Sequence, residues 1–86
     1  MYYYSTKGTC SSMIAVDLDK DHTIRTVAFR GGCHGNLQGI SKLTEGRKAE
    51  DMISMLEGIR CGYKDTSCPD QLAKALREAI GALEKG

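Results

Sequence analysis

The sequence predicts an α+β fold, in which a three-stranded antiparallel sheet is followed by three helices packed on one of its faces. Before the glycine pair Gly31-Gly32, short segments rich in β-branched and aromatic residues alternate with turn-forming residues. After this pair, apolar residues recur with the spacing of helices. A chain of 86 residues is the size of one domain with a small core. We therefore expect residues 1–86 to form a single domain.

Three strands are expected in the first part of the chain, at residues 2–6, 13–18 and 23–29. The second strand alternates most cleanly, because Ile14, Val16 and Leu18 fall on one face of an extended chain. Turn-forming residues separate the strands at positions 8–12 and 19–22. His22 lies at the tip of the second turn, where we expect it to be solvated and without a role.

The helix expected in the middle of the second half begins near residue 49. Its apolar residues are spaced at i, i+3, i+4 and i+7, which places them on one stripe: Ala49, Met52, Ile53 and Leu56. Gly58 can end this helix. A shorter helix at residues 35–43 is expected from the spacing of Leu37, Ile40 and Leu43, although Gly39 is unfavourable in its middle.

The last helix has the clearest boundary. Pro69 suits a first turn, and the negative charge of Asp70 complements the helix dipole. Cys68 is then expected to be the cap residue. The buried stripe should consist of Leu72, Leu76, Ala79, Ile80 and Leu83.

The charge and hydropathy patterns exclude several classes of partner. The formal net charge is +1, and the lysines and arginines are scattered, so we expect no binding of nucleic acid or of an anionic membrane. No apolar run approaches the roughly 18 residues of a membrane span, and the first residues lack the pattern of a secretion signal. These features favour a cytoplasmic protein.

Four cysteines are the candidate functional residues: Cys10, Cys33, Cys61 and Cys68. All four fall at the ends of predicted elements, and two lie at helix N-termini, where the dipole favours the thiolate. In a reducing cytoplasm such residues indicate a metal site or redox chemistry more often than disulfides. Because 22, 27 and 6 residues separate them, no paired zinc-knuckle motif is present, and the fold must bring the ligands together.

We expect the four thiols to hold a zinc ion or an iron–sulfur cluster, since tetrahedral thiolate sites suit both. His34 is an alternative ligand. A second hypothesis makes Cys61 and Cys68 a redox dithiol pair. Unrelated thiols, a structural disulfide and a non-catalytic interaction module stay open. No Ser-His-Asp set or carboxylate pair supports a hydrolase.

Two motifs carry a resemblance that covers nearly the whole chain. The motifs are residues 31–36 (Gly-Gly-Cys-His-Gly-Asn) and the run Thr66-Ser67-Cys68-Pro69-Asp70. Together with the four cysteines, they resemble the small stand-alone proteins of the TSCPD domain family. The same domain occurs near the C-terminus of adenosylcobalamin-dependent ribonucleotide reductases. The resemblance therefore implies an accessory, metal-binding or thiol-relay role in ribonucleotide reduction and DNA synthesis. The implied partner is a ribonucleotide reductase or a redox protein, and a homo-oligomer is also open. The chain is too short to be a complete reductase.

A more distant resemblance is to iron–sulfur scaffold proteins of the NifU and IscU type. Residues 29–33 (Phe-Arg-Gly-Gly-Cys) and 41–48 are similar to the scaffold's second cysteine segment and to the helix and Gly-Lys turn that follow it. The resemblance implies that Cys10, Cys33 and Cys68 correspond to the three scaffold ligands, with Cys61 as a fourth. The acidic residue after the first scaffold cysteine is replaced here by Ser11-Ser12, and the Leu-Pro-Pro segment is absent. The fold and the meeting of the cysteines are implied, and the scaffold activity is not.

Overall fold

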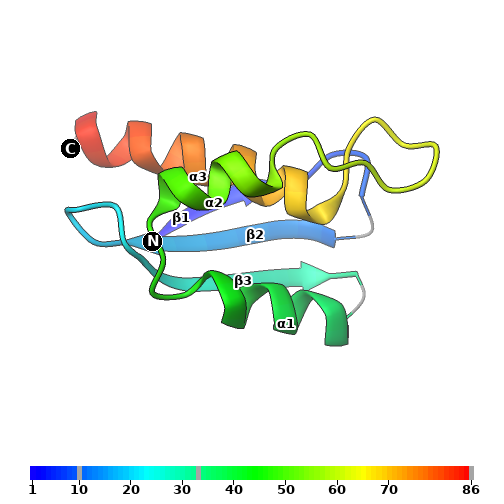
Figure 1. Cartoon of the computed structure of the whole chain (residues 1–86), viewed down its shortest axis with the longest axis horizontal. Coiled ribbons are helices and arrows are strands. Elements are labelled where there is room, and N and C mark those ends of the chain that lie inside the picture. Colours follow the sequence, from blue (N-terminus) through cyan, green and yellow to red (C-terminus); the bar gives the residue numbers. More distant parts are fainter. Residues whose placement is uncertain (10, 33, 86) are drawn as a thin grey trace.

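A computed structural model describes every residue except 10, 33 and 86, together with the backbone but not the side chain of His34. Figure 1 shows the described elements in chain order. They are β1 (Tyr2–Ser5), β2 (Ser11–Leu18), β3 (Ile24–Gly31), α1 (His34–Thr44), α2 (Ala49–Leu56) and α3 (Cys68–Lys85). The predicted α+β class and the order of its elements are confirmed.

The sheet is an antiparallel meander with the strand order β1-β2-β3. Val16 pairs with Tyr2 on one side and with Val27 on the other, so these side chains share one face. Two predicted strand boundaries are wrong by two residues, and the end of β1 and the start of β3 differ from the prediction by one residue. β2 begins at Ser11 rather than at residue 13, and β3 ends at Gly31 rather than at residue 29, because Ser11 and Gly31 pair across a register shift. Gly31 and Gly32 both have φ of 79°, which a glycine tolerates best.

The hydrophobic core lies on one face of the sheet, as predicted. Ile14 and Val16 are almost fully buried there against Leu72 and Leu76 of α3. Ile40 of α1 and the buried Met52 and Ile53 of α2 pack against the same cluster. Burying each such side chain contributes about 1.5–3 kcal/mol. The opposite face of the sheet carries Tyr3, which is 63% exposed.

The predicted apolar stripe of α3 is correct as far as Ile80 and wrong at Leu83. Leu72, Leu76 and Ala79 are buried, and Ile80 packs at the edge of the core. Leu83 is 37% exposed, because it borders a shallow cavity beside Met1 and Leu18 that no described residue fills.

The turn between α1 and α2 is tied to the β2–β3 hairpin. The Ile24 N–H donates to the Arg47 carbonyl at 2.8 Å, and the Ala49 N–H donates to the His22 carbonyl at 2.8 Å. His22 has φ of 70°, and its Nδ1 pairs with the Glu50 carboxylate. Its side chain is only 19% exposed, so the expectation that His22 is merely solvated is wrong. Among the described residues, no helix is long and apolar enough to cross a membrane.

Candidate functional site

The start of α3 is fixed by a serine cap. The Asp70 N–H donates to Ser67 Oγ at 3.1 Å, and the Gln71 N–H donates to the Ser67 carbonyl at 2.8 Å. Ser67 is therefore the cap residue, and Cys68 is the first residue of the helix. The prediction that Cys68 caps α3 is wrong, because the serine hydroxyl immediately before it is the stronger acceptor for a free helix N–H. The Ser67 hydroxyl also donates to the Ile59 carbonyl at 2.6 Å.

Asp70 anchors the loop between α2 and α3. Its side chain is buried, and its Oδ1 accepts the Gly58 N–H at 2.7 Å. Its Oδ2 accepts the Thr66 hydroxyl and lies 3.5 Å from Lys74 Nζ. Burial by itself would raise the pKa of Asp70, but these hydrogen bonds and the positive charge of Lys74 hold the pKa below its usual range. The carboxylate is thus a fixed structural anion.

A second set of hydrogen bonds joins α3 to the loop between β1 and β2. Thr66 Oγ1 accepts Gln71 Nε2 at 2.9 Å, and Gln71 Oε1 accepts the Lys7 N–H at 3.1 Å. Gly8 follows with φ of 73°, and a Cβ built there would lie 3.2 Å from Thr66 Cγ2. The spacing of Ser67 and Asp70, which matches a capping pattern, could have signalled the local part of this network. Its long-range part has no sequence signal.

These contacts position two of the four predicted cysteines. Cys61 is an exposed free thiol in the loop before α3. Its N–H donates to the Thr66 carbonyl at 3.1 Å, and its carbonyl accepts the Lys64 N–H at 3.0 Å. The Cys68 side chain is half-buried at the first position of α3, and its Sγ lies 3.4 Å from Ser11 Oγ. The first residue of β2 therefore contacts the first residue of α3.

One groove brings these segments together. Its volume is about 560 Å³, and its walls come from α1, the loop before α3 and the first turn of α3. The lining includes Asn36, Leu37, Ile40, Cys61, Cys68 and Pro69. Cys61 and Cys68 thus share a surface with the first turns of α1.

The other predicted ligands are not placed. Cys10, Cys33 and the side chain of His34 lie outside the described residues. Within the described part of the chain, no group of three or more His, Cys, Asp or Glu side chains could hold a metal ion. The described residues therefore supply two thiols at the groove, and the complete ligand set stays a prediction.

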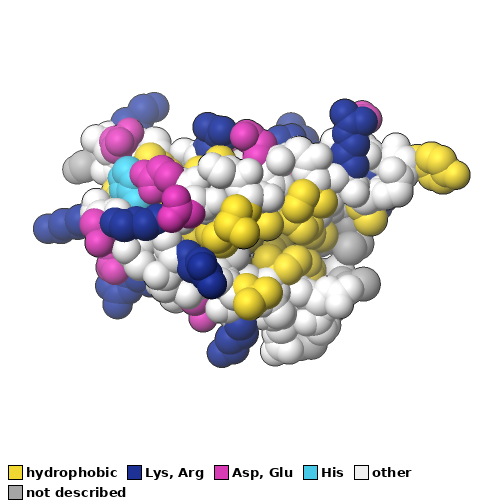
Figure 2. All heavy atoms as spheres, viewed as in Figure 1, with side chains coloured by type: hydrophobic (Ala, Val, Ile, Leu, Met, Phe, Trp, Pro, Cys, Tyr) yellow, Lys and Arg dark blue, Asp and Glu magenta, His cyan; other side chains and the backbone are white. Residues whose placement is uncertain are grey.

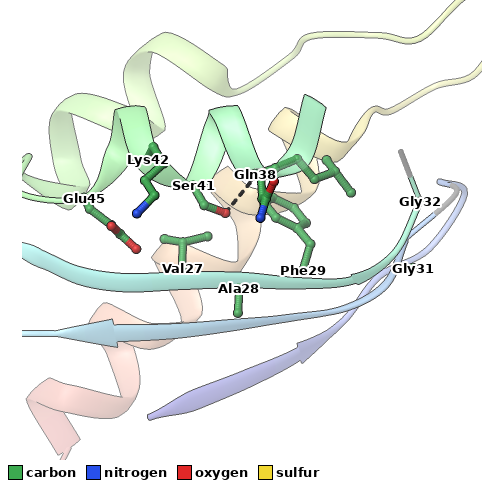
Figure 3. A pocket seen from close by; sticks show the side chains of 10 residues that line it. Val27, Ala28, Phe29, Gly31, Gly32, Gln38, Ser41, Lys42 and Glu45 are labelled. Carbon is green, nitrogen blue, oxygen red and sulfur yellow. Dashed lines mark hydrogen bonds between the residues drawn. The ribbon is translucent and has the colours of Figure 1, made fainter. Parts of the chain in front are cut away.

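A second cavity, of about 320 Å³, lies between α1 and β3. Figure 3 shows Gln38, Ser41 and Lys42 along the helix that covers it. The Ser41 hydroxyl is already used within the helix, where it donates to the Leu37 carbonyl at 2.9 Å. No described cysteine or histidine lines this cavity, so the groove with Cys61 and Cys68 is the better candidate for thiol chemistry.

Fold and groove together define a small α+β domain that carries thiols at the edge of a surface groove. Residues 2–80 match the family model of the TSCPD domain. The chain therefore belongs to the TSCPD domain family. Neither a curated protein nor a solved structure shows significant similarity to it. The resemblance to NifU and IscU scaffolds consequently stays a prediction.

Proposed function

We propose that this TSCPD domain binds a metal through the thiolates of Cys10, Cys33, Cys61 and Cys68. The observation that carries the proposal is that Cys61 and Cys68, the two cysteines that the structure describes, line one groove. Cys61 and Cys68 line the same groove as Asn36 of α1, and Ser11 contacts Cys68. Ser11 also pairs with Gly31 at the end of β3, so the start of β2, the end of β3 and the start of α3 are neighbours in the fold.

The chemistry of the donors favours thiolates as the ligands. Asp70, the buried carboxylate closest in sequence to Cys68, already accepts hydrogen bonds from Gly58 and Thr66. Cys68 lies at the N-terminus of α3, where the helix dipole favours a negative charge. Four thiolates suit zinc or an iron–sulfur cluster, and His34 is the alternative to one of them. A site of reduced thiols also fits a cytoplasmic location.

Metal analysis of protein purified without air tests this proposal. A zinc protein should contain one colourless metal ion per chain, whereas an iron–sulfur protein should contain iron and sulfide and absorb visible light. The variants Cys61→Ser and Cys68→Ser should each lower the metal content. Ser54→Ala, on the exposed side of α2, is a matched control that should retain it. Protein without stoichiometric metal, in which all four thiols react freely, would reject the proposal.

A second candidate function is a dithiol relay to a ribonucleotide reductase or another redox protein. It is favoured by the position of Cys61 and Cys68 on one groove and by the exposure of Cys61. The two thiols would transfer two electrons and two protons to a partner disulfide, which is reduced while a Cys61–Cys68 disulfide forms. Substitution of either cysteine by serine should then abolish reductant-dependent turnover of the partner reductase. Turnover that survives both substitutions would exclude the relay.

A further inference from the structure

Two glycines in α1 leave space in the groove, and no contact among the described residues requires glycine at either position. Gly35 and Gly39 lie one helical turn apart and line the groove. A Cβ built at either position would meet no described atom within 4 Å outside the helix's own backbone, and neither glycine has a left-handed φ. Gly39 lies in the middle of α1, where glycine is destabilising relative to alanine, whereas Gly35 lies in the first turn. The packing of the described residues therefore does not explain why both positions lack a side chain.

Apolar side chains line the same groove, from the buried Leu37 to the exposed Leu43. Leu37, Ile40 and Leu43 of α1 line it opposite Pro69, and Leu43 is 71% exposed. Figure 2 shows hydrophobic side chains gathered on this face of the molecule. Ile59, in the loop that leads to Cys61, is 41% exposed. An open groove with exposed apolar walls is typical of a surface that a partner covers.

The charges near the groove indicate the chemistry of that partner. Arg47 lies beside Leu43, because its Nε donates to the Leu43 carbonyl at 3.2 Å. Arg60 lies between Ile59 and Cys61 in the chain. Neither arginine forms an ion pair with a described residue, and no carboxylate lines the groove. Lys64 and Asp65 are adjacent in the same loop as Arg60, so together they add no net charge there.

We propose that this groove docks a short apolar segment of a partner protein that carries carboxylates on its flanks. The apolar side chains would fill the space above Gly35 and Gly39, and the carboxylates would face Arg47 and Arg60. A second copy of this chain fits less well, because a symmetric contact through the groove would bring these arginines toward like charges. The inference rests on the shape and charge of the groove and does not depend on metal binding.

The first test uses a displayed library of random 12-residue peptides and the full chain purified without air. Selected peptides should combine large apolar residues with net negative charge. Their binding should weaken with added salt and change the amide NMR signals of residues 35–43 and 59–61. A library without binders, binders that lack carboxylates, or signal changes elsewhere would overturn the proposal. A stable homodimer that protects Leu43 would also overturn it, because the second copy would then be the occupant.

The second test fills the groove without weakening the fold. Gly39→Gln should raise the thermal midpoint, because it replaces a glycine inside a helix with a good helix former whose Cβ meets no described atom within 4 Å outside the helix's own backbone. It should weaken binding of the selected peptide by about tenfold or more, the effect of losing an anchoring contact. Gly81→Gln is the matched control in α3, where an added Cβ also meets no atom within 4 Å and the groove is untouched.

The metal content of both variants separates the docking proposal from the proposed function. We expect Gly81→Gln to hold the same amount of metal as the original chain. Because Gly39 lines the groove beside Cys61 and Cys68, peptide binding by both variants is also compared in the presence of a chelator, where we again expect weaker binding by Gly39→Gln. Equal peptide binding by the two variants would overturn the docking proposal, whatever the metal content proves to be.

Discussion

Asp70 combines burial, charge and three partners in a single side chain, so its protonation state bears directly on stability. Its carboxylate accepts hydrogen bonds from Gly58 and Thr66 and lies near Lys74. In Asp70→Asn, an amide NH2 group would replace the carboxylate oxygen that accepts the Thr66 hydroxyl, so two donors would face each other. The attraction to the positive charge of Lys74 would also be lost. We expect a loss of about 1–3 kcal/mol in the free energy of unfolding at pH 7, measured by urea denaturation.

The pH dependence of unfolding should change with the same substitution. The pKa of Asp70 is lowered in the folded chain, so its charged form stabilises the fold above the ordinary aspartate pKa of about 3.9. This contribution is lost as the pH falls below that value toward the lowered pKa. The loss of stability below about pH 4 should therefore be shallower in Asp70→Asn than in the original chain. Parallel acid profiles of the two proteins would contradict the assigned role.

Ser67 fixes the helix position of the adjacent Cys68. Ser67→Ala removes the acceptor for the Asp70 N–H and the donor to the Ile59 carbonyl. We expect a destabilisation of about 1–2 kcal/mol by thermal or urea unfolding, of which the cap supplies about 1 kcal/mol. Ser54→Ala removes only a hydroxyl that bonds back to Glu50 on an exposed helix face, and it should change stability by less than about 0.5 kcal/mol.

At the scale of elements, Gly8 sets how closely the loop between β1 and β2 approaches α3. Gly8→Ala combines a left-handed φ of 73° with a Cβ that lies 3.2 Å from Thr66 Cγ2. Gly46→Ala has a similar φ of 87° but no atom within 4 Å of its Cβ. We expect a cost of about 1–2 kcal/mol for Gly46→Ala and about 2–3 kcal/mol for Gly8→Ala, measured by urea denaturation. Equal losses of unfolding free energy in the two variants would show that the Thr66 side chain moves aside at no cost.

The elements that the sequence predicts well are those whose signal is local. The spacing of Met52 and Ile53, or of Leu72 and Leu76, reports which side of a helix is buried, because the helical period acts within one element. The start of β2 at Ser11 depends instead on pairing with Gly31, which is 20 residues away in the chain. His22 was likewise misjudged, since its partner Glu50 belongs to another element.

For the whole molecule, the candidate site depends on contacts between its first residues and its last helix. Ser11 reaches Cys68, and the Lys7 N–H reaches Gln71, across most of the sequence. All four cysteines lie at the ends of predicted elements, and from this we predicted a shared site. Only the fold can show which thiols line the same surface. It places Cys61 and Cys68 on one groove, whereas Cys10 and Cys33 lie outside the described residues.

Metal removal should therefore act on the fold as a whole, if the proposed ligands are correct. A metal held by residues from the β1–β2 loop to α3 binds the folded chain and not the dispersed ligands of the unfolded one. At a free metal concentration of about 100 times the dissociation constant, this linkage contributes about 2.7 kcal/mol. For a domain of this size, such a loss lowers the thermal midpoint by about 10 °C or more.

Calorimetry with and without a chelator measures this shift in the thermal midpoint. It should shrink in Cys68→Ser and as the pH is lowered, because protonated thiols release the metal. An equal shift in the original chain and in Cys68→Ser would show that the chelator acts elsewhere.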